Sequence, residues 1–246
     1  MTNDRLNTKY KPGAYGKKRL SAAAWADANI KKWDNRSTPD IPVKQDQDIF
    51  PCICFSRQIG LGALKIADYL SKALPYRVVD REILEYMAKE KNLSEKAIAF
   101  FDERYPGKMS ELFSMLISEK TFLKSDYARQ LARTVTVLAG TEPTIFVGRG
   151  THLILPRKRV LAVSLVSGTD YRIDRLARII NVSRTEAENQ LKVLDKEQKQ
   201  YFKSVFNTEG NDPKDFDLVI SRDHIRDARQ ATRIIACAFE QKFNPE

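Results

Sequence analysis

Short apolar runs separated by helical patterns dominate the chain from residue 51 onward. Five of these runs have the length and the β-branched or aromatic content of strands, namely Cys52–Phe55, Tyr76–Asp80, Thr144–Val147, Val160–Val166 and Phe216–Ile220. Strands that alternate with helices form a parallel sheet whose two faces are covered. The pattern therefore predicts an α/β fold with a five-stranded parallel sheet and helices on both faces.

Amphipathic periodicity between these runs predicts the helices. They are expected at about residues 20–33, 63–74 and 82–88, from residue 94, at 109–138, from residue 170, and at 184–202 and 223–243. Ser183 and Glu186 form a capping-box pattern at the start of the helix at 184–202.

Residues 1–48 have a different composition from the rest. Pro12, Gly13 and Gly16 with basic neighbours predict an irregular arm, and residues 37–42 resemble a linker. An anion-binding or partner-binding tail and a poorly ordered extension both fit this arm. The chain is thus expected to divide into a basic arm, 1–48, and one domain, 49–246.

Composition narrows the class of protein and the partners. The chain of 246 residues is 42% hydrophobic and 30% charged, contains no apolar run of membrane-spanning length and does not begin like a signal peptide, so we expect a cytoplasmic protein with no membrane partner. A formal charge of +10 favours anionic partners. Nucleic acid is not an expected partner, because no motif for it is recognisable.

Cysteine and histidine are too sparse to organise the fold. Three cysteines argue against a disulfide framework, and with only two histidines no metal site is expected. We expect Cys52 and Cys54 to share one face of a buried strand and Cys237 to pack in the core.

A glycine turn joins the first strand to the first helix of the domain. Gly60 and Gly62 lie where a phosphate could meet the amides of a helix start. The strict phosphate-loop pattern is incomplete, because Ala63 and Leu64 occupy its lysine and hydroxyl positions and Lys65 is the nearest cation. A phosphate-binding loop and an ordinary strand-to-helix turn both remain open.

Two further strand ends carry charged groups. Ligands of such sheets bind at the carboxyl ends of strands, where Asp80 and Arg81 end one strand and Arg149 follows another. Gly148 and Gly150 leave room for the Arg149 guanidinium to contact two phosphate oxygens. A salt bridge from Arg149 to Asp80 is the alternative, and neither is excluded.

Three arginines recur at every third position of the helix that follows the fourth strand: Arg172, Arg175 and Arg178. This basic stripe could close over a polyphosphate, which fits phosphoryl transfer because that reaction depends on positioning and on cations. A solvated face paired with Asp170 and Asp174 is the alternative.

The order of the motifs is similar to that of a known family, the cytidylate kinase-like family of P-loop nucleotide kinases. The matching segments are Ser56–Gly62, Val79–Leu84, Val147–Gly150, Arg172–Arg178, Asp195–Glu197 with Tyr201, Asp212–Pro213 and Phe216–Ile220. The resemblance runs from about Pro51 to the C-terminus. It implies a three-layer P-loop kinase fold with a helical monophosphate-binding region at about 80–138 and a lid at about 170–203.

The resemblance also implies roles for individual residues. Donor phosphates would contact Ser56, Arg57, Gln58, Gly60, Gly62 and Lys65. The acceptor monophosphate would face Asp80, Arg81 and Arg149, and the catalytic group would comprise Arg172, Arg175, Arg178 and Asp195. ATP with Mg²⁺ is the expected donor, and a nucleoside monophosphate such as CMP is the expected acceptor.

This chain departs from the family pattern within the turn. The family commonly has Gly-Ser-Gly-Gly-Arg-Glu, whereas Leu61 replaces the hydroxyl and Leu64 the arginine, and Gln198 stands where the family often has arginine. Loss of cations weakens transition-state stabilisation. A degenerate kinase fold acting as a nucleotide-binding or protein-interaction module is therefore the alternative to an active kinase. The apolar face of residues 109–138 could also pack against a second copy.

Overall fold

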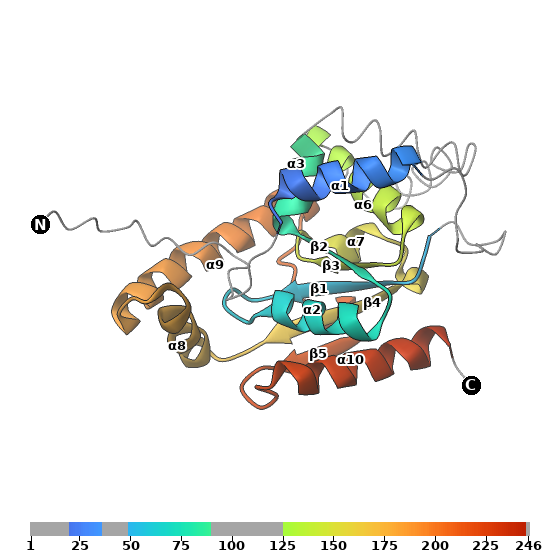
Figure 1. Cartoon of the computed structure of the whole chain (residues 1–246). Helices are drawn as coiled ribbons and strands as arrows, with labels where there is room; N and C mark the ends of the chain where they lie inside the picture. The colour runs from blue at the N-terminus through green and yellow to red at the C-terminus, as the bar shows by residue number, and fades with distance from the viewer. Residues whose placement is uncertain (1–19, 36–48, 90–124, 245–246) are drawn as a thin grey trace, which may run out of the picture.

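The computed structural model describes residues 20–35, 49–89 and 125–244, and its centre is a parallel β-sheet (Figure 1). The strands are β1 (Cys52–Arg57), β2 (Arg77–Asp80), β3 (Thr144–Val147), β4 (Val160–Val166) and β5 (Leu218–Ser221). They pair in the order β2-β3-β1-β4-β5, and every pair is parallel. The predicted five-stranded parallel sheet is confirmed. The bounds of β3 and β4 match the predicted ranges.

Helices cover both faces of the sheet (Figure 1). On one face lie α2 (Ala63–Ala73) and α10 (Ala228–Phe243). On the other lie α3 (Arg81–Lys89), α6 (Asp126–Thr141) and α7 (Thr151–Ile154). The short 3-10 turns η1 (Arg157–Arg159) and η2 (Pro213–Asp215) precede β4 and β5. The expected three-layer α/β arrangement is therefore present.

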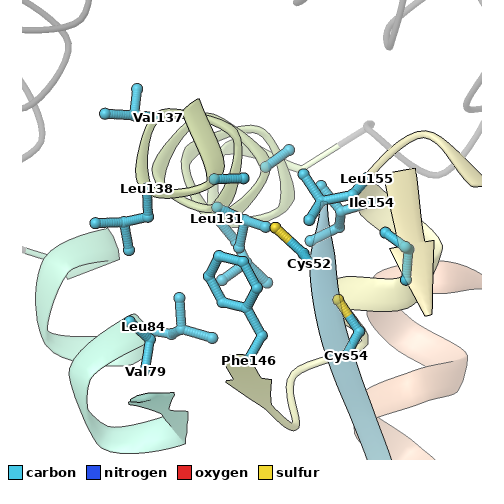
Figure 2. Close-up of a cluster of buried hydrophobic side chains, with 14 of the residues drawn as sticks. Cys52, Cys54, Val79, Leu84, Leu131, Val137, Leu138, Phe146, Ile154 and Leu155 are labelled. Carbon is cyan, nitrogen blue, oxygen red and sulfur yellow. The ribbon is translucent and has the colours of Figure 1, made fainter. Parts of the chain in front are cut away.

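Side chains alternate between the two cores along β1. Ile53 and Phe55 pack with α2 and α10, whereas Cys52 and Cys54 pack with Phe146 beneath α6. Figure 2 shows the Cys52 sulfur directed toward the ring of Phe146, with Cys54 further along β1. Burial raises the pKa of the Cys54 thiol to about 12, so this thiol stays protonated and acts as a packing group. Cys237 is exposed on α10, so its predicted place in the core is wrong.

A helical hairpin extends from the carboxyl side of the sheet (Figure 1). It consists of α8 (Thr169–Ile180) and α9 (Arg184–Phe206). Its two helices share a small apolar core with Ile59 of the glycine turn, made of Ile173, Leu176, Ala187 and Leu191. Ser183 caps α9 as predicted, because its hydroxyl accepts a hydrogen bond from the amide of Glu186. The turn and the hairpin are thus packed as one unit.

Two predicted helices differ from their expected bounds. A continuous helix through 109–138 is wrong at Ser125, which is extended and caps α6 by accepting from the amide of Ala128 at 3.1 Å. The last helix begins after Asp227, not at Asp223, because the Arg222 guanidinium holds the intervening loop by donating to its carbonyls. The helix predicted from residue 94 lies outside the described residues. Among the described helices, none combines the length and apolar character that a membrane crossing requires.

Arg77 links the first helix of the chain to the sheet. The helix α1 (Ala22–Asn35), expected near residues 20–33, packs against α3. Trp25 lies 5.7 Å from the Arg77 guanidinium, and the same group donates to the Leu138 carbonyl at 2.7 Å and to Asn29. Part of the N-terminal arm therefore lies on the domain.

We predict that Arg77→Ala lowers the free energy of unfolding by about 2–4 kcal/mol, because it removes one half-buried charged donor that binds the Leu138 carbonyl and the hydroxyls of Thr141 and Thr144 together. Urea denaturation measures the change. Lys158→Ala, at an exposed position, is the matched control and should stay within about 0.5 kcal/mol of the parent. Equal effects of the two substitutions would contradict the role assigned to Arg77.

Candidate functional site

The glycine turn after β1 has an open backbone and an apolar interior. Gly60 and Gly62 have φ of 91° and 71°, a region that favours glycine, and Gly62 begins α2 without a capping side chain. Leu61 and Leu64 are buried, whereas Lys65 is exposed on α2. The cation nearest in sequence therefore points to solvent, and the turn itself offers backbone groups.

An arginine from α8 lies directly over this turn. A Cβ atom built on Gly62 would overlap Nη2 of Arg175 and lie 3.1 Å from its Cζ, so a side chain at this position would push the guanidinium aside. Nε of Arg175 is buried without a hydrogen-bond partner in the structure. A cation thus faces the positive end of α2, an arrangement that a bound anion would stabilise.

Arg172 holds the base of the hairpin on the same turn. Its Nε donates to the carbonyl of Ile59 at 2.9 Å, and its Nη2 pairs with Asp195 of α9. Arg172 is only 5% exposed, so it acts as a buried tie between the turn, α8 and α9. Arg178 is exposed and donates to the Asp174 carbonyl at 3.2 Å, while Asp170 and Asp174 pair with Arg184.

A second strained turn positions Arg149 at the end of β3. Gly148, Arg149 and Gly150 all have positive φ, of 93°, 57° and 66°. The amide of Gly148 donates to the Phe55 carbonyl of β1 at 2.9 Å, and a Cβ on Gly150 would collide with the ring of Phe206. These contacts fix the direction in which the Arg149 side chain leaves the strand.

Arg149 is enclosed by an acidic and an aromatic partner. Its guanidinium pairs with Glu85 of α3 and lies 4.2 Å from the ring centroid of Tyr201. Burial lowers the pKa of Arg149 to about 10; the Tyr201 hydroxyl opposes this shift, and the charge of Arg81 adds to it. Burial also raises the pKa of the Tyr201 hydroxyl well above its usual value. The Arg149 guanidinium is therefore charged at neutral pH.

These elements enclose a cavity of about 260 Å³ at the carboxyl end of the sheet. Its wall consists of Ser56, Arg57, Ile59, Arg81, Gly148, Arg149, Leu194, Glu197, Gln198, Tyr201 and Phe202. Three arginines from three strand ends therefore meet in one cavity, closed on one side by α9. This size and charge fit a small anionic ligand.

The remaining predicted site residues contribute to the framework of the site. The carboxylate of Asp80 caps α3 by accepting from the amide of Ile83 at 3.1 Å. Gln58 accepts from the amide of Ser167 at 2.8 Å. Gln198 donates to the Arg57 carbonyl at 2.9 Å. Within the described ranges, no three His, Cys, Asp or Glu side chains form a group that could hold a metal ion.

Sequence reasoning missed Glu85 and Glu197 as residues of the site and did not place Arg57 beside Arg149. Glu85 lies four residues after Arg81, a spacing that predicts an ion pair along a helix, and that signal was available. Its second partner, Arg149, lies 64 residues away and is brought near only by the pairing of β2 with β3.

Together, the sheet order, the helices on both faces and the arginine-lined cavity define a kinase-like α/β protein. A family model described as "Cytidylate kinase-like family" matches residues 52–224. The chain belongs to this family, as its motifs predicted. The turn, the cavity and the hairpin all lie within the matched residues.

Comparisons with individual proteins are more distant. An uncharacterized protein from Eubacterium ventriosum has a crystal structure that is 19% identical, with a TM-score of 0.60, covering 79% of this chain and 99% of that one. This likeness supports the fold. Shikimate kinase from Bacteroides thetaiotaomicron is 12% identical, with a TM-score of 0.41 over 77% of this chain and 96% of that one. No curated protein matches the chain.

We predict that Gly62→Ala lowers the free energy of unfolding by about 1 kcal/mol or more, because alanine is strained at positive φ and its methyl group would displace Arg175. Gly168→Ala is the control. Gly168 has φ of −62°, and a Cβ there would meet its nearest atoms at 3.7 Å. Chemical denaturation of both variants tests the prediction, and a neutral Gly62→Ala would contradict it.

Proposed function

We propose that the protein is a nucleotide kinase that transfers the γ-phosphoryl group of ATP to a nucleoside monophosphate such as CMP. The observation that carries the proposal is the meeting of Arg57, Arg81 and Arg149 in one cavity beside the glycine turn. Phosphoryl transfer needs two anionic groups aligned and their charge neutralised. Family membership supports the kinase chemistry, and the chemistry of these residues supports an anionic acceptor.

On the donor side, the triphosphate would lie between the glycine turn and α8. The turn would supply backbone amides, and Arg175 would supply the cation that the turn lacks. Arg172 would hold α8 in place over the glycine turn through its bonds to Ile59 and Asp195. Arg178, which lies three residues after Arg175 at an exposed position of α8, would reach the transferring group only if the hairpin at about 170–203 closes as a lid.

On the acceptor side, the phosphate would enter the cavity and contact Arg81 and Arg149. A planar guanidinium matches two phosphate oxygens, and the buried position of Arg149 strengthens the interaction. Ser56 is buried in the same wall and would donate its hydroxyl. The nucleoside would extend toward the helical region at about 80–138, much of which lies outside the described residues.

Magnesium would arrive with ATP as part of the substrate. In phosphoryl-transfer sites this ion is held mainly by phosphate oxygens and water, with one or two protein ligands. Leu64 occupies the position where a hydroxyl would bind it, so the turn offers no side-chain ligand there. In this proposal the protein's own contribution to charge neutralisation comes from arginine.

Ligand binding and turnover together test the proposal. We expect MgATP and one nucleoside monophosphate each to raise the melting temperature, since a ligand at a hundred times its Kd adds about 2.7 kcal/mol to the stability. We also expect ADP to form when both are present. Binding without ADP formation would contradict the kinase and favour a nucleotide-binding regulatory module. Absence of binding by any nucleotide would contradict both.

A second prediction concerns the cation of the donor site. Arg175→Ala should weaken MgATP binding at least about tenfold, since a cation on the phosphates typically contributes more than 1 kcal/mol. Lys65→Ala should change it less than about threefold, because Lys65 is exposed. Lys192→Ala, exposed on α9, controls for net charge. Isothermal titration calorimetry gives the three Kd values, and a larger loss in Lys65→Ala would reverse the assignment.

A further inference from the structure

One carboxylate oxygen holds two arginines of the cavity at once. Oε1 of Glu85 accepts from Nε of Arg81 at 3.0 Å, and the same atom pairs with Nη2 of Arg149. Arg81 and Arg149 both line the cavity, and Glu85 lies behind them on α3. The carboxylate therefore contacts the two groups that an incoming anion would need.

The electrostatics of the cavity explain why this contact forms. The Arg149 side chain is 10% exposed, and the positive charges of Arg81 and Arg57 repel its guanidinium. A buried guanidinium beside like charges is costly unless an anion neutralises it. Tyr201 contacts Arg149 through its ring but supplies no full negative charge. Glu85 supplies this anion through its contact with the Arg149 guanidinium.

We propose that Glu85 is an internal anion that competes with the acceptor phosphate for Arg81 and Arg149 and so determines which anions enter the cavity. This inference rests on the proposed function for the identity of the acceptor. Glu85 is a positioning residue, because it acts through the two arginines.

Competition of this kind makes binding an exchange of one anion for another. A bare anion such as inorganic phosphate must displace Glu85 and gains only the difference between two similar ion pairs. A nucleotide gains the same difference plus the contacts of its nucleoside, which bare phosphate lacks. The cavity would therefore exclude inorganic phosphate while still accepting a phosphorylated nucleoside.

The test is the binding of inorganic phosphate to the full chain at constant ionic strength. We expect Glu85→Gln to lower the Kd of phosphate about tenfold, because the substitution removes a competing charge a few ångströms from the bound anion. Glu82→Gln is the matched control, with the same change of charge on an exposed position of the same helix, and it should leave the Kd unchanged. A purely structural role for Glu85 predicts the opposite result, weaker binding.

Glu85→Asp provides a second variant should Glu85→Gln fail to fold. It keeps the charge but withdraws the carboxylate by one methylene, so an intermediate gain in phosphate affinity is expected. An unchanged or raised Kd in the folded variants, or unfolding of both, would make Glu85 a structural tie and overturn the inference. These outcomes are independent of the kinase assay, because wild-type protein without nucleotide binding or turnover would contradict the proposed function alone.

Discussion

Guanidinium groups that meet in a partly buried cavity repel one another, and this repulsion must be offset by an anion or the cavity opens. The sheet order brings Arg57, Arg81 and Arg149 together because β1, β2 and β3 end at the same edge. Glu85 and Tyr201 stabilise this arrangement through their contacts with Arg149. The same cluster is suited to an anionic acceptor. Stability and ligand preference therefore depend on one set of charges.

Glycine has two separate structural roles around this cluster. At Gly62 the missing side chain admits Arg175 to the start of α2, and at Gly150 it admits the ring of Phe206. Each close approach joins the α8–α9 hairpin to the carboxyl end of a strand. In the proposed mechanism, donor and acceptor would be aligned by a hairpin that packs on both turns. Ile59 of the first turn lies in the apolar core of that hairpin.

The architecture was predictable because buried parallel strands are apolar on both faces. The apolar runs predict Thr144–Val147 and Val160–Val166 at their observed bounds, and the order of the motifs predicts the family. Helix starts are harder to predict. Ser125 and Asp227 begin helices through capping hydrogen bonds, whereas the apolar periodicity of the sequence continues across both positions.

Pairings between distant side chains were the least predictable part of the site. Arg149 could have met a phosphate or Asp80, and in the structure it pairs with Glu85, while Asp80 caps α3. The arginine stripe likewise divides into a buried tie, a cation over the glycine turn and an exposed residue. Three-residue spacing cannot distinguish these roles, because burial depends on how α9 packs.

A crystal structure with a bisubstrate analogue, adenosine and cytidine joined through five phosphates, together with Mg²⁺, tests the central claim most directly. The account predicts that the polyphosphate lies between Gly62 and Arg175, and that the phosphate next to cytidine contacts Arg81 and Arg149. Glu85 would then have lost at least one of its two arginine contacts. An analogue bound away from the cavity, or phosphates that contact neither Arg175 nor the pair Arg81 and Arg149, would contradict the account.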